Sequence, residues 1–213
     1  PLIIYILKTL SKIKLIDRII VSTDFLDLEK IVKNKFKKKI EIHRRPANLC
    51  GDKVPLTSVV KYTAKYLYNK ENYKPDIVLQ VAPTCPFIKK NTILKMLNLL
   101  KKNKTNCCVT LKRIEHEHPY RAKKFNKNNF IFKKFLKNIN VEKFISRQDL
   151  PELYCTSGGI YARTFSLLKT FNGKNFCLGN KPLGVVVDEI ESINIDRIID
   201  FEFAAFVSKK YKL

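Results

Sequence analysis

The chain has 213 residues, 45% of them hydrophobic and 29% charged. That is the length of one domain with enough apolar residues for a core, so the composition excludes a globally disordered chain. No apolar run is long enough to span a membrane. The six cysteines are scattered and none belongs to a CxxC pair, which argues against a zinc site and predicts a reducing, cytoplasmic setting.

The formal charge is +23, from 42 basic and 19 acidic residues. A charge of this size fits a basic nucleic-acid-binding module. The lysines, however, are distributed along the whole chain rather than gathered in one stripe, so we expect no specific nucleic-acid site. The same positive field favours an anionic small-molecule substrate.

The first half of the chain alternates between helical and strand patterns. We expect helices over 2–11, from about 24, over 57–69 and from 91, and strands over 18–22, 40–42, 76–81 and 107–111. This alternation predicts an α/β fold with a mainly parallel sheet and helices on both faces. Ligands of such sheets bind at the carboxyl ends of the strands.

The second half is less regular. Residues 123–145 are rich in Lys, Asn and Phe, and we expect a hairpin or excursion that carries a dimer contact. Gly158-Gly159 leads into a short strand at 160–162, where the glycines allow a close backbone approach. A strand over 184–187 and a C-terminal helix over 195–207 complete the pattern.

Two polar stretches are candidates for chemistry. Arg147 and Gln148 fit a site that grips a carboxylate or a phosphate, although a surface loop explains them equally well. Six acids crowd into residues 188–202. They fit Mg²⁺ binding with shared phosphates, or the acidic N-terminus of a helix. Both alternatives stay open at this point.

The order of short motifs resembles the acylneuraminate cytidylyltransferases, which make CMP-activated sugar acids. The resemblance covers nearly the whole chain. The matching segments are Val21-Ser22-Thr23-Asp24, Arg45-Pro46-Ala47-Asn48-Leu49, Pro83-Thr84-Cys85-Pro86, His118-Pro119-Tyr120, Arg147-Gln148-Asp149-Leu150-Pro151, Gly158-Gly159-Ile160-Tyr161 and Asn194-Ile195-Asp196.

This resemblance implies a single Rossmann-like nucleotidyltransferase domain over 1–213, with an excursion at about 115–155 used in homodimerisation. It implies that CMP passes from CTP to a sialic-acid-like sugar acid, that pyrophosphate leaves, and that Mg²⁺ assists. The implied catalytic residues are Arg147, Gln148 and Asp196, and the implied metal ligands are Asp196 and Asn194. The implied substrate-binding residues are Arg45 and Ser58 near the nucleotide, Gln80, Thr84, and Tyr161 in the sugar pocket.

Three departures from the family pattern bear on these expectations. The family opens with a glycine- and lysine-containing loop that grips the triphosphate, and residues 1–213 lack it, so we expect this fragment alone to be inactive. Asn194 stands where the family usually has a first aspartate. Ala82 and Ser157 replace a common Gln and a common Asn, which leaves the sugar undetermined. A nucleotidyltransferase for another sugar, or a catalytically impaired member that serves as a binding or interaction domain, is therefore an alternative.

Overall fold

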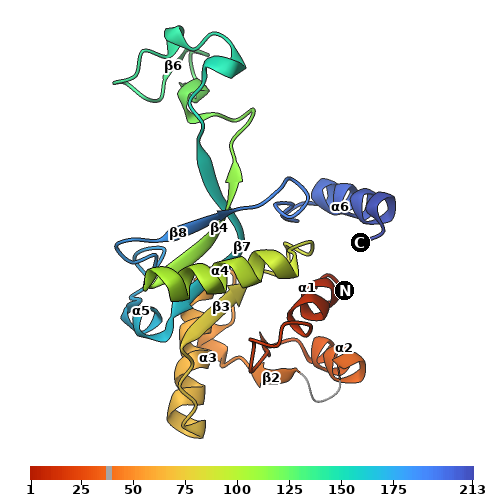
Figure 1. Cartoon of the computed structure of the whole chain (residues 1–213). Coiled ribbons are helices and arrows are strands. Elements are labelled where there is room, and N and C mark those ends of the chain that lie inside the picture. The colour runs from red at the N-terminus through yellow and green to blue at the C-terminus, as the bar shows by residue number, and fades with distance from the viewer. Residues whose placement is uncertain (37–39) are drawn as a thin grey trace.

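The computed structural model describes residues 1–36 and 40–213, and it is an α/β fold (Figure 1). The helices are α1 (Ile3–Leu10), α2 (Leu26–Phe36), α3 (Leu56–Glu71), α4 (Lys90–Asn103), α5 (Phe165–Thr170) and α6 (Ile198–Tyr211). The strands are β1 (Ile20–Thr23), β2 (Glu41–Arg44), β3 (Ile77–Val81), β4 (Cys107–Arg113), β5 (Lys123–Phe125), β6 (Phe132–Lys134), β7 (Tyr154–Thr164) and β8 (Leu183–Val186). Each predicted helix and strand is present, while α5 was not predicted.

The central sheet has four strands in the order β3-β7-β4-β8. β4 and β8 are parallel, but β7 is antiparallel to both β3 and β4. The sheet is therefore mixed, with β3, β4 and β8 running in one direction and β7 in the other. The excursion is the reason. The chain leaves the sheet at the end of β4, and after the excursion it returns as β7, which runs back beside β4 in the opposite direction. Pairing on both edges also makes β7 much longer than the predicted 160–162.

β1 and β2 form a separate parallel pair. Within the described residues, no ladder of backbone hydrogen bonds joins β1 to β3. Two helices connect the sheets instead, since α3 contacts both β1 and β3. Ile6 and Leu10 of α1 pack in the main core, and Leu7 packs with Val21 of β1.

Helices cover both faces of the four-stranded sheet, as predicted. On one face, α4 and α1 bury a core that includes Ile93, Met96, Cys108 and Ile160. On the other face, α3 and α5 pack through a smaller cluster that contains Ala64, Phe165 and Leu168. This arrangement leaves the strand ends open to loops, and Arg45 and Thr84 lie in such loops, after β2 and β3.

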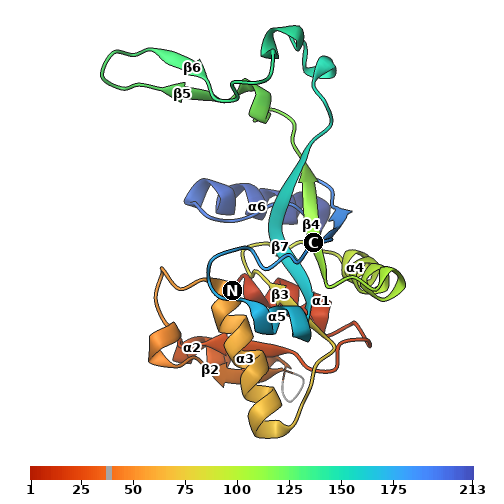
Figure 2. The same cartoon turned by 90° about the vertical axis from the view of Figure 1, so that its left-hand side faces the viewer.

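The excursion is an arm that projects from the body and ends in the antiparallel β5–β6 hairpin (Figures 1 and 2). The predicted hairpin is thus confirmed. Its aromatic side chains are exposed, with Phe130 exposed to 78%. Short 3-10 turns in and near the arm lie at Pro119–Arg121, Val141–Lys143 and Arg147–Asp149, and another lies in the body at Ala47–Leu49.

Helix α6 begins three residues later than predicted and presents an unusual surface. Ala204 and Val207 are buried against Phe87, while Phe203 and Phe206 are more than half exposed.

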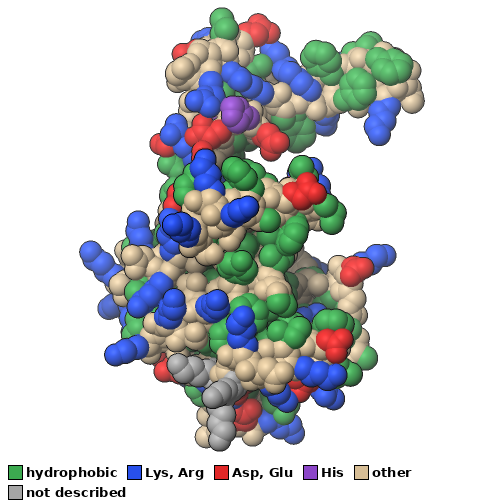
Figure 3. All heavy atoms as spheres, turned by 90° about the vertical axis from the view of Figure 1, so that its right-hand side faces the viewer, with side chains coloured by type: hydrophobic (Ala, Val, Ile, Leu, Met, Phe, Trp, Pro, Cys, Tyr) green, Lys and Arg blue, Asp and Glu red, His purple; other side chains and the backbone are tan. Residues whose placement is uncertain are grey.

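Figure 3 shows basic side chains spread over the visible face of the molecule rather than lined up in one stripe. Among the described helices, none has the length and hydropathy needed to cross a membrane. All six cysteines are free.

Candidate functional site

Two segments far apart in sequence meet at the end of β3. The backbone amide of Ile195 donates to the carbonyl oxygen of Thr84 at 2.9 Å. The Cys85 thiol donates to Oδ1 of Asn194 at 3.5 Å. Burial raises the pKa of Cys85 to about 11, so its sulfur stays protonated at neutral pH and can donate. The Pro-Thr-Cys-Pro loop therefore forms one unit with the segment from Asn194 to Asp196.

Asn194 and Asp196 are joined directly. Nδ2 of Asn194 donates to Oδ2 of Asp196 at 2.6 Å, and Asp196 is exposed. Mg²⁺ is usually held by one or two carboxylates together with substrate phosphates. The exposed carboxylate of Asp196 beside the side-chain carbonyl of Asn194 is suited to binding Mg²⁺ in this way. No group of three or more His, Cys, Asp or Glu side chains that could hold a metal by themselves occurs in the described part of the chain.

The neighbouring acids serve structural roles instead. Asp188 is paired with Lys89. The carboxylate of Glu191 is buried, where its Oε1 accepts from the backbone amide of Lys89 and from Oγ1 of Thr92, both at 2.7 Å. Asp200, in the first turn of α6, accepts from the backbone amides of Asp196 and Arg197 just before that helix. Of the two open explanations for this acidic stretch, the helix N-terminus thus accounts for Asp200, while Asp196 is exposed and its neighbour Ile195 contacts Thr84.

A second polar cluster lies on the α3 face of the sheet. Gln80 of β3 is paired in register with Tyr161 of β7, so both side chains share this face. Oε1 of Gln80 accepts from Oγ1 of Thr57 at 3.0 Å and from Nη1 of Arg163 at 2.9 Å. Arg163 also lies over the Tyr161 ring, with its Cζ 4.6 Å from the ring centroid.

Sequence reasoning missed Thr57 and Arg163. The signal for Arg163 was its spacing, because a residue two positions after Tyr161 in a strand points to the same face. A lone arginine in an apolar strand is unusual unless its donors find partners inside. No sequence signal connected Thr57 to Gln80.

The paired glycines at the start of β7 have distinct structural reasons. Gly158 has φ +79°, a left-handed conformation that favours glycine. A Cβ on Gly159 would lie 2.5 Å from Cδ1 of Ile88 and 3.3 Å from Cβ of Cys85. The backbone of β7 thus approaches the Thr84 loop closely, as predicted, and Ala82 donates its amide to the Gly159 carbonyl at 2.9 Å.

Arg45 and Ser58 lie where neighbouring strand and helix ends meet. Nη2 of Arg45 donates to the carbonyl of Ser22 at 2.9 Å, and the backbone amide of Arg45 donates to the carbonyl of Thr23. Ser58 is in the first turn of α3, where no side chain caps the helix. Arg45 is thus anchored on the end of β1, and Ser58 lies beside Thr57 at a helix N-terminus.

Arg147 and Gln148 are not brought to these clusters. They form a 3-10 turn in the arm, where Nη1 of Arg147 lies 3.6 Å from Oε2 of Glu115. No hydrogen bond or ion pair of the described residues links either side chain to Asp196. The turn lines a cavity of about 210 Å³ together with Arg113, Glu115, His118 and Pro151.

His118 is buried in this part of the arm and has both ring nitrogens engaged. Nε2 lies 3.1 Å from the carbonyl oxygen of Pro151, and Nδ1 accepts from the amide of Tyr120 at 3.2 Å. The ring therefore holds the two sides of the arm together.

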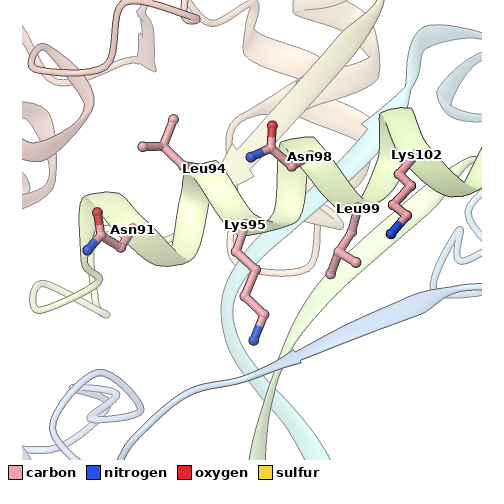
Figure 4. Close-up of a pocket in the computed structure, with 6 residues that line it drawn as sticks. All are labelled: Asn91, Leu94, Lys95, Asn98, Leu99 and Lys102. Atoms are coloured by element: carbon pink, nitrogen blue, oxygen red, sulfur yellow. The ribbon is translucent and has the colours of Figure 1, made fainter.

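A second surface hollow, of about 370 Å³, lies along α4 and contains none of the expected site residues (Figure 4). Its lining residues are Asn91, Leu94, Lys95, Asn98, Leu99 and Lys102.

Comparison with known families gives the class of the chain. The family described as "Cytidylyltransferase" matches residues 1–175, which is most of the sequence. The chain belongs to this cytidylyltransferase family. No curated protein is significantly similar to it in sequence. The matched residues extend past the end of β7 and include Arg45, the Thr84 loop and Tyr161. Asn194 and Asp196 lie beyond the matched residues.

Solved structures of low sequence identity share the cytidylyltransferase fold. A CMP:2-keto-3-deoxy-manno-octonic acid synthetase complexed with CTP has a TM-score of 0.66 at 14% identity, covering 99% of this chain and 88% of that one. A 4-diphosphocytidyl-2C-methyl-D-erythritol synthase from Anaerococcus prevotii has 0.64 at 17%, covering 97% and 86%. The bifunctional IspDF from Campylobacter jejuni has 0.57 at 16%, covering 95% of this chain and 46% of that one. At these identities the likeness shows the fold alone, a Rossmann-like nucleotidyltransferase fold.

Proposed function

We propose that this chain transfers CMP from CTP to a sialic-acid-like, nonulosonic-type sugar acid and releases pyrophosphate. The observation that carries the proposal is the contact between the Thr84 loop and Asn194, two family-like motifs separated by 109 residues. The ordered motifs and the family membership support the same reaction. The neighbour complexed with CTP, a CMP-sugar-acid synthetase by its description, adds support for the substrate class.

The reaction defines what the residues have to do. An oxygen of a sugar hydroxyl attacks the α-phosphorus of CTP and loses its proton. The bond from that phosphorus to the oxygen bridging to the β-phosphate breaks, and pyrophosphate leaves with the electron pair. Such a transfer depends on alignment and on neutralising the phosphates. Asp196 and Asn194 would hold Mg²⁺, which would supply positive charge to neutralise the phosphate oxygens.

The remaining roles follow the chemistry of each side chain. We assign Arg45 and Ser58 to the nucleotide, because a guanidinium and a helix N-terminus both favour phosphate. Gln80 and Tyr161 would contact the sugar acid from the sheet, and Thr84 would border the reacting groups. Arg147 and Gln148 would meet the carboxylate or the phosphates from the arm.

The arm assignment goes together with a proposed homodimer. An isolated two-stranded hairpin is marginally stable in water, and this one exposes Phe125, Phe130 and Phe132. A second copy that covers the arm would bury these side chains. It would also bring an arm next to a body, where Arg147 and Gln148 have a route to substrate that a single protomer does not offer.

We further propose that residues 1–213 act as a single domain. Helix α3 contacts both β1 and β3, and α1 packs against both sheets, which supports one continuous body.

The test is an assay of pyrophosphate release by the full-length gene product. It would contain CTP, Mg²⁺ and one of sialic, legionaminic, pseudaminic or octulosonic acid. We expect release with at least one of them and none without Mg²⁺. Absence of release with every acid, from a folded protein that binds no CTP in calorimetry, would overturn the proposal.

A nucleotidyltransferase for another sugar, such as a sugar alcohol, is the second candidate. The synthase for 4-diphosphocytidyl-2C-methyl-D-erythritol is as similar in fold as the sugar-acid synthetase. Methylerythritol phosphate in the same assay separates the two candidates. CTP binding without turnover of any acceptor would instead favour an impaired member, a possibility that rests on Asn194.

A further inference from the structure

Arg163 is the most deeply buried cation near the candidate site. It lies on β7 with 2% of its surface exposed. Each of its three nitrogens donates to an uncharged acceptor: Nε to the carbonyl of Cys177 at 2.8 Å, Nη2 to the carbonyl of Phe176 at 3.0 Å, and Nη1 to the Gln80 side chain at 2.9 Å. No carboxylate pairs with it in the described residues. A guanidinium is costly to bury, so its retention here calls for a reason beyond packing.

The bond to Gln80 decides which way that carboxamide points. Arginine has donors and no acceptor, so it has to face the amide oxygen. The Thr57 hydroxyl, 3.0 Å away, is the second donor to the same oxygen. With the oxygen held from two sides, the Gln80 amide nitrogen is directed away from Arg163. No described residue accepts a hydrogen bond from that nitrogen.

The same guanidinium also orients Tyr161. Its Cζ lies 4.6 Å from the ring centroid, which is a cation–π distance. Tyr161 is the register partner of Gln80 across β3 and β7. One arginine therefore fixes both side chains that we assign to the sugar acid. Through the carbonyls of Phe176 and Cys177 it ties the loop after α5 to the same place.

Lysine cannot orient these groups in the same way. Three acceptors surround Arg163 in different directions, and a planar fork of five N–H groups reaches them together, whereas an ammonium is a point charge. A lysine at this position keeps a positive charge on β7 but loses the fixed geometry. The substitution thus separates charge from orientation.

We propose that Arg163 is a positioning residue that sets the Gln80 carboxamide with its nitrogen toward the substrate and holds the Tyr161 ring beside it. The Gln80 nitrogen then donates to an oxygen of the sugar acid, and the CTP contacts do not depend on it. This inference rests on the proposed function for the substrate, but the orientation of Gln80 can be tested without it.

The kinetic test uses the full-length protein with Arg163→Lys and Arg163→Met. We expect the KM for the sugar acid to rise about tenfold or more in both variants, while the KM for CTP stays within about twofold. Arg121→Met is the matched control, because Arg121 also donates to a backbone carbonyl but is exposed in the arm. A folded Arg163→Lys variant with an unchanged KM for the sugar acid would overturn the substrate part of the proposal.

The structural test follows the side-chain amide signals of Gln80 by ¹⁵N NMR, assigned by their absence in Gln80→Leu. We expect Arg163→Lys to move these signals and Arg121→Met to leave them in place. If Arg163→Lys leaves them unmoved, Arg163 does not orient Gln80 and the inference is wrong. If wild-type protein releases no pyrophosphate with any acid, the proposed function fails, and the NMR comparison still decides the positioning role.

Discussion

Replacing Asn194 with aspartate tests how the metal site is built. The family pattern usually has a carboxylate at this position, and here Asn194 donates to Asp196 over 2.6 Å. Asn194→Asp removes the donor and sets two carboxylates side by side. Without a cation between them they repel, and with Mg²⁺ they become the paired ligands that this ion prefers.

The cost without metal follows from two contributions. A hydrogen bond to a charged group contributes about 1.5–3 kcal/mol. Two exposed carboxylates about 4 Å apart add about 1 kcal/mol of repulsion in water. Because Asp196 is exposed, we take the lower values and expect a loss of about 2.5 kcal/mol in the free energy of unfolding. For a chain of this length that corresponds to a fall in Tm of about 5–10 °C.

The assay is thermal unfolding of wild type and Asn194→Asp, each in chelator and over a series of Mg²⁺ concentrations. Saturation of a site at a hundred times its Kd adds about 2.7 kcal/mol, so Mg²⁺ should restore or exceed the lost stability in the variant. Wild type should respond less. Asn98→Asp, on the exposed side of α4, controls for the added charge. Equal Mg²⁺ responses of the two proteins would refute the reasoning.

Three further substitutions test the framework around the site. Glu191→Ala leaves the buried Thr92 hydroxyl and the partly buried Lys89 amide without an acceptor and should cost about 3 kcal/mol in urea unfolding. Glu189→Ala, at an exposed position, should change stability by less than about 0.5 kcal/mol. Gly159→Ala forces a methyl into the side chain packed against it and should cost about 1–3 kcal/mol, measured in the same way. A hydrogen bond from Arg18 lowers the pKa of Glu41 in the folded protein. The ionised Glu41 therefore stabilises the fold above about pH 4.5, and this stabilisation is lost as the pH falls through the folded-state pKa. Glu41→Gln should therefore be less stable than wild type at pH 7 and equally stable at acidic pH.

Each of these has a result that contradicts it. Equal losses for both glutamate variants would mean that the buried carboxylate holds nothing in place. An unchanged stability of the glycine variant would mean that β7 and the Thr84 loop separate easily. A difference between Glu41→Gln and wild type that persists at acidic pH would place the effect in packing rather than in ionisation.

The local pattern of the sequence was sufficient for most of the elements. Apolar spacing located α1, α3, α4, β3 and β4 to within a few residues, because burial of one face imposes its period on the chain. The direction of β7 was beyond that reasoning. A strand pattern is the same in both directions, and only the return from the arm makes this strand antiparallel.

The candidate site divides in the same way. Motif order predicted roles for both the Thr84 loop and Asn194, and the fold brings that loop into contact with Asn194 through Cys85. The network of Gln80 with Arg163 depends on the register between two strands 83 residues apart, which no local pattern encodes. The separation of Arg147 from Asp196 depends on where the arm projects, and that is also a property of the whole chain.

The central place of β7 has a consequence for synthesis. β3 and β4 are made first, but neither pairs with the other, since β7 lies between them. The whole arm has to be made before the strand that joins them appears. At the usual 5–20 residues per second, the roughly fifty residues after β4 take about 3–10 s. During that time β3 and β4 have unpaired edges on the nascent chain. A codon-dependent pause in translation of the arm would lengthen the interval in which these edges can aggregate.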